Sequence, residues 1–118
     1  KKVDVTQENS YIYEPNAAII KAGAFKLIAQ QFQLLQMAQH THLYLSHQRI
    51  DNFPGRVWQI ITTNIKDIKD LRANIMTRNY PLTPEQLRKK LKLKDSHTHT
   101  IIGARLADKP TLFLCKKI

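Results

Sequence analysis

The chain has 118 residues, which is the length of one ordinary domain or of two small subdomains that share a core. Its composition, 42% hydrophobic and 24% charged, supports a buried core and excludes a largely disordered chain. No apolar run approaches the roughly 18–20 residues that span a bilayer, and one cysteine, Cys115, excludes an internal disulfide and a multi-cysteine zinc module. These features predict a cytoplasmic protein with no membrane partner. A first residue other than Met, Lys1, indicates a processed chain or a part of a longer one.

Positive charge is concentrated in the second half of the chain. Nineteen Lys and Arg residues against nine Asp and Glu residues give a formal net charge of +10. Residues 1–55 hold five basic and four acidic side chains, and residues 56–118 hold fourteen basic and five acidic ones, so the net charges are +1 and +9. A polyanionic partner such as a nucleic acid would therefore meet the C-terminal half. The alternative is that these side chains only keep a small domain soluble.

The first half of the chain predicts a β-α-β unit. Residues 11–13 are aromatic and β-branched and predict a short strand. Asn16 is a suitable N-cap for a helix over residues 17–35, in which apolar residues recur at the three- and four-residue steps of one helix face. These apolar residues are Ile20, Ala24, Leu27, Ile28, Phe32 and Leu35. Residues 43–46 predict the second strand.

A turn-forming run at residues 51–55, Asp-Asn-Phe-Pro-Gly, marks an internal boundary. Residues 57–61 follow as a strand rich in β-branched residues, which we expect in the centre of the sheet. Asn64 can cap a second helix. The side chains that this helix would turn inward are Ile65, Ile68 and Leu71. Residues 74–80 alternate between apolar and polar side chains well enough to predict another strand.

The most strongly specified element is a helix that begins after Thr83. Thr83 is the expected N-cap, Pro84 occupies the first helical position, and Gln86 can complete a capping box. Leu82 and Leu87 are spaced to form a hydrophobic staple across the helix start. Four start signals therefore coincide, and the helix is expected to continue through residue 94.

The end of the chain predicts an antiparallel hairpin. Residues 98–106 and 111–116 are rich in β-formers, and residues 107–110, Ala-Asp-Lys-Pro, supply a turn between them. The element order predicts an α+β fold, in which three helices pack on a mixed β-sheet that ends in this hairpin.

The sequence contains no recognisable catalytic or cofactor-binding motif. Gly23, Gly55 and Gly103 are isolated, so no glycine-rich loop can hold phosphates or a nucleotide cofactor. The acidic residues are scattered singly and form no two-carboxylate pair. We therefore expect no enzymatic activity and no cofactor-binding residues in this chain.

Five histidines raise the possibility of a metal site. His40 and His42, and likewise His97 and His99, are two residues apart and would share one face of a strand, with His47 nearby. No third ligand with a suitable spacing accompanies either pair. A metal-dependent enzyme built on these histidines is a weaker hypothesis than nucleic-acid binding or a purely structural role, and we expect no metal ligands.

For several other reactive or aromatic side chains, packing in or near the core is the simplest interpretation. Cys115 lies among apolar residues of the last strand, with no general base indicated nearby. Trp58 lies in a strand that we expect to be buried. Four tyrosines could stack on bases, but each alternates with apolar neighbours, which favours the margin of the core. They are Tyr11, Tyr13, Tyr44 and Tyr80.

The basic run of the predicted helix is the best candidate for a binding surface. Five positive charges fall within residues 88–94, and no acidic residue interrupts them. They are Arg88, Lys89, Lys90, Lys92 and Lys94. At about 100° per residue they cover most of the helix outside a narrow Leu87/Leu91 edge. They would either contact phosphates or form a solvated face whose lysine stems cover apolar surface.

Four stretches of the chain resemble one known family. They are residues 11–23 (YIYEPNAAIIKAG), 53–58 (FPGRVW), 78–82 (RNYPL) and 85–94 (EQLRKKLKLK). Together they resemble the C-terminal region of a bacterial group of predicted class I S-adenosylmethionine-dependent methyltransferases. In that group a catalytic domain is followed by a small ferredoxin-like segment and a THUMP-like domain, named for its similarity to an RNA-binding module of RNA-modifying enzymes.

The polar residues at the start of the chain predict a flexible lead-in at residues 1–10. The resemblance implies a ferredoxin-like β-α-β segment at 11–55 and a THUMP-like domain at 56–118. It also implies that S-adenosylmethionine binds a catalytic domain upstream. This chain would then hold structured RNA, either tRNA or rRNA, through residues 88–94 with Arg78 as a neighbouring contact. The alternative is a structural domain that docks the catalytic domain or mediates dimerisation. Lys21, Lys26 and Lys109 lie outside the basic run and would serve as comparison residues in a mutational test.

Overall fold

The computed structural model describes residues 10–67, 70–96 and 98–118. Of the predicted lead-in, only Ser10 is among them. The N-terminal half contains strand β1 (Tyr11–Pro15), helices α1 (Ala17–Lys21) and α2 (Phe25–Gln31), and strands β2 (Leu35–Gln36) and β3 (Tyr44–Ser46). The C-terminal half contains β4 (Gly55–Thr62), the 3₁₀ helix η1 (Ile65–Asp67), β5 (Asn74–Arg78), α3 (Pro84–Leu91), β6 (His99–Leu106) and β7 (Lys109–Lys117).

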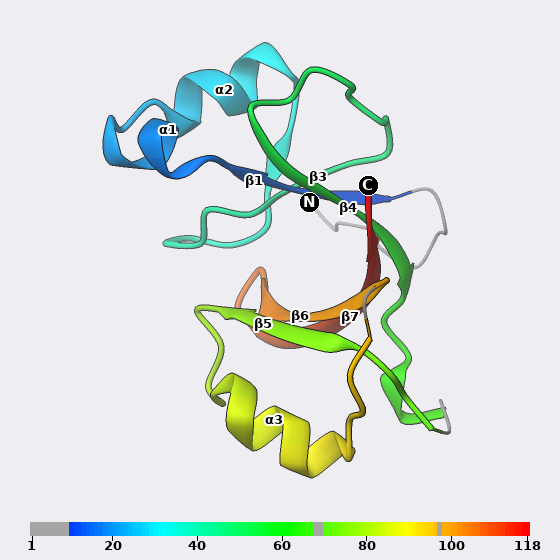
Figure 1. Cartoon of the computed structure of the whole chain (residues 1–118). Coiled ribbons are helices and arrows are strands. Elements are labelled where there is room, and N and C mark those ends of the chain that lie inside the picture. Colours follow the sequence, from blue (N-terminus) through cyan, green and yellow to red (C-terminus); the bar gives the residue numbers. More distant parts are fainter. Residues whose placement is uncertain (1–9, 68–69, 97) are drawn as a thin grey trace.

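The strands form one mixed sheet in the order β2-β3-β1-β4-β7-β6-β5. The pairing is antiparallel throughout except for the parallel pair β5 and β6. Strand β4 occupies the centre, and its pairing with β1 joins the two halves (Figure 1). The α+β class and the central position of β4 are thereby confirmed. The sheet runs without interruption across residue 55, and the predicted division there stays a prediction.

The helix predicted over residues 17–35 is wrong in its length. Asn16 caps α1 as expected, with its side chain accepting a hydrogen bond of 3.0 Å from the Ile19 amide. The helix breaks at Gly23, whose φ of +73° lies in the left-handed region that glycine adopts without steric cost. Gln33, at φ +55°, then turns the chain into β2, a strand that the helical period concealed.

The helix predicted from Asn64 is also wrong. The chain makes only the 3₁₀ turn η1 and becomes extended by Arg72, which forms a parallel β-bridge with Lys94. Ile65 and Leu71 are both buried in the same cluster, so their spacing reflects burial and not helical periodicity. Ile68 lies outside the described residues. Three α-helices do pack on the sheet, but two of them come from one predicted helix.

The two remaining local predictions hold closely. Thr83 accepts a hydrogen bond of 3.2 Å from the Gln86 amide, and the Gln86 side chain accepts one of 2.9 Å from the Thr83 amide, which confirms the capping box. The C-terminal hairpin is confirmed with a tighter turn than expected, because Leu106 already pairs with Lys109 and Ala107 adopts φ +55°. The helix ends at Leu91, before the predicted residue 94, because Lys92 caps it in the left-handed conformation.

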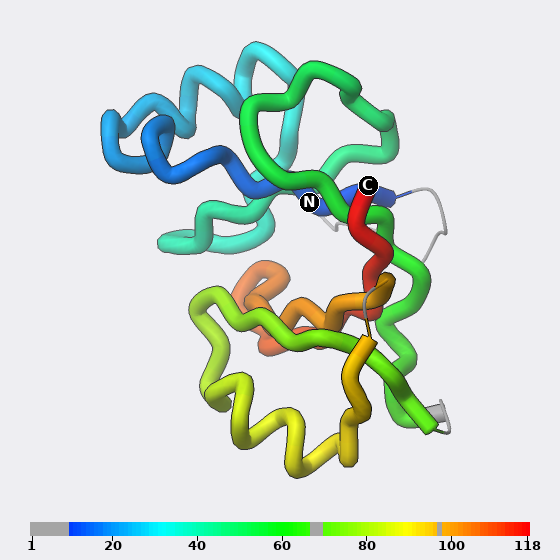
Figure 2. Tube along the Cα trace, viewed as in Figure 1, coloured from blue at the N-terminus to red at the C-terminus, as the bar shows by residue number. Residues whose placement is uncertain are grey.

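The sheet is strongly curled, with the helices on its outer face. The inner face carries a core drawn from both halves, including Ile12 and Leu45 from one and Ile102 and Phe113 from the other. Helix α2 covers the outer face at one end, with α1 next to it, and α3 covers the outer face at the other end (Figures 1 and 2). None of the helices within the described ranges is long and apolar enough to cross a membrane.

Long-range polar contacts close the curl by joining the two edges of the sheet. The Ala107 amide, in the β6–β7 turn, donates a hydrogen bond of 2.7 Å to the Met37 carbonyl, just after β2. The Asn79 side chain, after β5, donates one of 3.2 Å to the Thr41 hydroxyl. Segments that lie at opposite ends of the strand order are therefore neighbours in space.

Candidate nucleic-acid interface

Helix α3 packs through a narrow apolar edge and turns its basic residues outward. Leu87 is 1% exposed and Leu91 packs against the buried cluster beneath the helix. Lys89 is exposed on the opposite side, Lys90 is exposed beside the apolar edge, and Arg88 is half-buried. The predicted Leu87/Leu91 edge is therefore confirmed.

The basic run does not continue as one helical face. Lys92 is the left-handed C-cap of α3, and Lys94 lies in the extended segment that pairs with Arg72. Both lysines are exposed. The run therefore curves over the end of α3, and its last two members occupy positions that helical geometry does not predict.

Within the described ranges, every ion pair that forms uses an arginine. Arg49 pairs with Asp51 at 3.7 Å, and Arg88 with Asp95 at 2.7 Å. The third pair joins Arg78 and Glu14, also at 2.7 Å. Arg88 is thus partly neutralised by its own chain. The four lysines of the run, Lys89, Lys90, Lys92 and Lys94, have no acidic partner among the described residues.

A groove lies beside α3 and contains two basic residues that sequence reasoning missed. This α3 groove, of about 640 Å³, is lined by Lys66 of η1 and Lys109 of β7 as well as by Lys90. Its apolar lining includes Tyr80, Leu87, Leu91 and Leu112. The three lysines are far apart in the sequence, and no local motif connects them. Lys109 is therefore unsuitable as a remote comparison residue.

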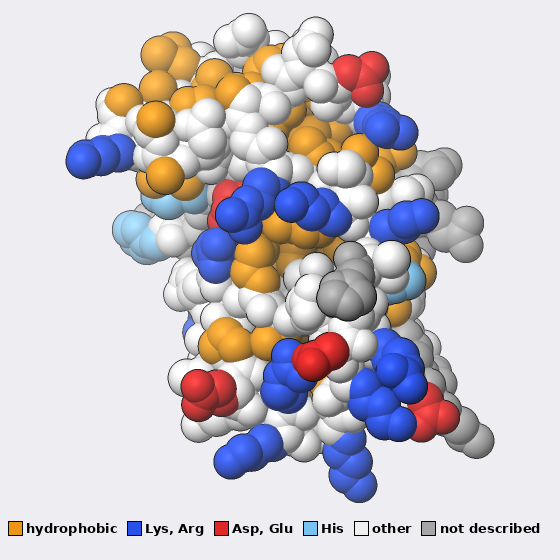
Figure 3. Space-filling view, in the orientation of Figure 1, with side chains coloured by type: hydrophobic (Ala, Val, Ile, Leu, Met, Phe, Trp, Pro, Cys, Tyr) orange, Lys and Arg blue, Asp and Glu red, His pale blue; other side chains and the backbone are white. Residues whose placement is uncertain are grey.

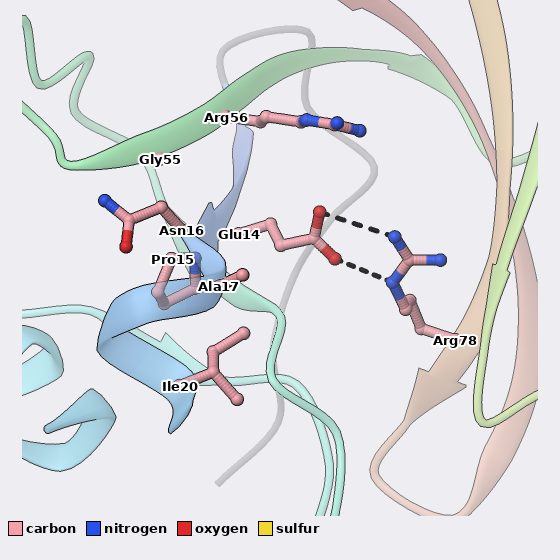
Figure 4. A pocket seen from close by; sticks show the side chains of 8 residues that line it. All are labelled: Glu14, Pro15, Asn16, Ala17, Ile20, Gly55, Arg56 and Arg78. Atoms are coloured by element: carbon pink, nitrogen blue, oxygen red, sulfur yellow. Dashed lines mark hydrogen bonds and ion pairs between the residues drawn. The ribbon is translucent and has the colours of Figure 1, made fainter. Parts of the chain in front are cut away.

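Arg78 does not lie beside the α3 lysines. It projects from the inner face of β5, whereas α3 covers the outer face, and its guanidinium group binds Glu14 of β1. Arg78 and Arg56 instead line a separate pocket of about 630 Å³ with Glu14, Asn16, Ile20 and Gly55 among its walls, called here the rim pocket (Figure 4). Lys and Arg side chains lie both across the middle of the molecule and around α3 on one face (Figure 3).

The packing roles predicted for Trp58 and Cys115 are confirmed. Both belong to the core of the inner face, with exposed fractions of 3% and 0%. Burial also raises the pKa of the Cys115 thiol well above its usual range, so the thiolate that nucleophilic chemistry requires is disfavoured. Among the tyrosines, Tyr13 and Tyr44 are buried, and the ring of Tyr80 lies against Gly103.

The histidines are used in local packing and hydrogen bonding. The His42 ring lies 4.4 Å from the Phe25 ring, centroid to centroid. The His47 Nδ1 atom is 3.1 Å from the Ser10 hydroxyl, and the His99 Nδ1 atom is 2.7 Å from the Thr98 hydroxyl. His97 lies outside the described residues. Across the ranges that the structure describes, no three His, Cys, Asp or Glu side chains are grouped to hold a metal ion.

Gly55 and Gly103 permit close packing, and Gly23 permits a turn. A Cβ atom on Gly55 would lie 2.0 Å from the Glu14 carbonyl oxygen, so the close pairing of β4 with β1 requires glycine there. A Cβ on Gly103 would lie 3.2 Å from the Tyr80 ring. Gly23 forms the break between α1 and α2. The expectation that this chain holds no cofactor stays a prediction.

Fold and surface together define a small α+β protein with an exposed lysine-rich helix. Comparison with known families places it more narrowly. Residues 11–54 match a ferredoxin-like domain family and residues 55–117 match the THUMP domain-like family. The chain therefore belongs to the THUMP domain-like family. The ferredoxin-like domain comes before the THUMP-like residues in the same chain.

One solved structure supports the same placement over nearly the full chain. It is a protein of Porphyromonas gingivalis W83 described as a "putative methyltransferase", 33% identical to this chain, with a TM-score of 0.78. The match covers 98% of this chain and 30% of the other. This chain therefore spans less than a third of that protein's length. No protein with curated annotation matches the chain.

Proposed function

We propose that this chain is a non-catalytic module that binds structured RNA, tRNA or rRNA, and positions it for an S-adenosylmethionine-dependent methyltransferase domain of the same cytoplasmic protein. The observation that carries the proposal is the set of exposed lysines on and after α3, which have no acidic partner within the described ranges. Exposed ammonium groups that the chain itself does not neutralise are free to displace counterions from phosphates.

The α3 groove supports a surface that follows a phosphate backbone. Lys66, Lys90 and Lys109 come from three different elements and surround one depression. Positioning RNA by its backbone and shape needs several such contacts in a fixed arrangement and no base-specific residues. Membership in the THUMP domain-like family agrees with RNA as the kind of partner.

The catalytic part of the proposal rests on the comparison alone. The matched protein of known structure carries the methyltransferase description, and this chain corresponds to 30% of it. Cofactor binding and methyl transfer would then belong to the remaining part of such a protein. The role left for this chain is to deliver substrate.

The test removes three charges from α3 without changing its length. In the variant Lys89→Gln, Lys90→Gln, Lys92→Gln, the helix propensity is nearly unchanged because Lys and Gln have similar values. The affinity for a labelled tRNA-like RNA, measured by fluorescence anisotropy, should fall similarly for unrelated sequences. The slope of log affinity against log salt should shrink by about one to three units, since each phosphate contact contributes roughly 0.7–0.9.

A matched variant controls for net charge. Lys21→Gln, Lys26→Gln, Lys116→Gln removes the same number of charges from exposed positions that do not line the α3 groove. It should retain most of the affinity. Equal losses in the two variants would indicate nonspecific attraction, and an unaffected α3 variant would place the RNA surface elsewhere or remove it.

A docking role is the second candidate, and one observation favours it. Leu27 of α2 is 68% exposed and Leu35 of β2 is 43% exposed, so the N-terminal half presents apolar side chains to solvent. Such side chains suit contact with another domain or a second copy. This role would replace RNA binding if both lysine variants bound RNA equally weakly.

A further inference from the structure

The rim pocket is the second place where basic side chains gather at a concave surface. It lies on the open rim of the curled sheet, where β1, β4 and β5 meet. One wall comes from the N-terminal half, through Glu14, Asn16 and Ile20, and the other from Arg56 and Arg78. The pocket therefore exists only when the two halves are folded together.

Arg78 is held in place by three hydrogen bonds. Its Nε atom donates to Glu14 Oε2 at 2.7 Å and its Nη2 atom to Glu14 Oε1 at 3.5 Å. Its Nη1 atom donates to the Thr77 carbonyl oxygen at 2.8 Å. These bonds fix the plane of the guanidinium group, yet each Nη atom keeps a further N–H that these bonds do not use.

Arg56 contributes a guanidinium group that the chain does not neutralise. It pairs with Glu14 in the register of β4 and β1, so the two side chains lie on the same face of the sheet. Both extend toward the side from which Arg78 enters (Figure 4). Arg56 is exposed and forms no ion pair within the described ranges. The pocket is therefore lined by two guanidinium groups and one carboxylate, an excess of one positive charge.

We propose that Arg56 and Arg78 bind one phosphate group of the bound RNA in the rim pocket, with Glu14 as the residue that positions Arg78. Arginine suits this role because its planar fork binds phosphate oxygens in a bidentate manner. The proposal rests on the proposed function for the source of the phosphate. It extends that function, because RNA would then contact both halves of the chain and not α3 alone.

Phosphate is favoured over an acidic protein segment by the surroundings of the pocket. Lys and Arg side chains form two groups on this face, one across its middle and one around α3 (Figure 3). A long polyanion such as an RNA strand can contact both groups at once, which a short acidic segment cannot do. The test must therefore distinguish a phosphate ligand from the carboxylates of an acidic peptide.

The experiment measures RNA binding by the full chain in three forms. Arg56→Gln should weaken binding of a labelled RNA stem-loop roughly tenfold, as expected for one charge-assisted contact. It should also lower the salt slope by about 0.7–0.9. Arg56→Lys keeps the charge and loses the fork, so it should bind more weakly than the unchanged chain with a nearly unchanged slope.

Lys26→Gln is the matched one-charge control, because Lys26 is exposed on α2 and lines neither the rim pocket nor the α3 groove. If Arg56→Gln weakened binding no more than this control, the proposal would be overturned. The same holds if Arg56→Lys bound as tightly as the unchanged chain, since Arg56 would then act only as a diffuse charge.

A second measurement separates this proposal from the proposed function. The Nε–Hε signals of the arginines are followed by nuclear magnetic resonance during titration with inorganic phosphate, against chloride at equal ionic strength. The Arg56 signal should move with phosphate and with RNA, and less with a polyglutamate peptide. A peptide response equal to that of RNA would reject phosphate as the ligand.

Failure of the rim-pocket proposal and failure of the proposed function would give different experimental results. Loss of RNA binding in the α3 variant, with no effect of Arg56→Gln and no phosphate response, would overturn the rim pocket and leave the proposed function in place. An unchanged chain that binds no RNA would overturn the proposed function and RNA as the source of phosphate, whatever the Arg56 signal does.

Discussion

Two buried tyrosines show how differently similar residues are used. The Tyr13 hydroxyl donates a hydrogen bond to the Gln48 carbonyl and accepts one of 3.0 Å from the Ile50 amide, which ties the loop after β3 to β1. The Tyr44 hydroxyl is buried and has no hydrogen-bond partner among the described residues. Burial raises the pKa of both hydroxyls, so both remain protonated at neutral pH.

We therefore expect opposite outcomes from the same substitution. Tyr13→Phe should lower the free energy of unfolding by about 1–2 kcal/mol, because it leaves the Ile50 amide and the Gln48 carbonyl without their partner. Tyr44→Phe should change it by less than about 0.5 kcal/mol or raise it, since it removes a polar group that is buried without a bond. Urea denaturation of the two variants provides the comparison, and equal losses would contradict it.

At the scale of elements, start signals were more reliable than periodicity. The capping box of α3 formed as expected because its members are three residues apart and interact in any helix that begins there. Of the apolar residues predicted to share one helix face over residues 17–35, Ile28 and Phe32 pack on the core, whereas Leu27 and Leu35 are exposed. Apolar periodicity therefore marked neither every buried side chain nor the residue at which the helix stops.

The cap of α3 gives a second prediction. Thr83→Ala removes the acceptor for the Gln86 amide and should cost about 1 kcal/mol of stability. Thr83→Ser keeps a hydroxyl and should cost much less. The midpoints of chemical denaturation of the two variants and of the unchanged chain provide the comparison. If the alanine variant unfolded at the same midpoint as the unchanged chain, the cap would contribute nothing.

At the scale of the molecule, the ion pair between Glu14 and Arg78 links strands of opposite halves. Its residues are 64 positions apart, and its side chains are 12% and 42% exposed. A partly shielded pair with two hydrogen bonds should stabilise the closed curl more than an average surface pair.

A double-mutant cycle measures that contribution. Glu14→Gln and Arg78→Gln, alone and combined, should give a coupling free energy of about 0.5–1 kcal/mol. High salt should reduce this coupling only slightly, because Glu14 is largely shielded from solvent. Strictly additive effects of the two substitutions would show that the pair does not hold the halves together.

Features that depend on neighbours along the chain could be predicted from the sequence. They are the α+β class, the capping box at Thr83, the C-terminal hairpin and the basic run at residues 88–94, which all rest on residues a few positions apart. The other features depend on long-range packing. The predicted helix is interrupted at Gly23. Lys66 and Lys109 lie in the same groove as Lys90. Arg78 pairs with Glu14 and does not lie beside α3. These outcomes depend on how a seven-stranded sheet curls and where its edges meet, and no short stretch of sequence specifies such long-range packing.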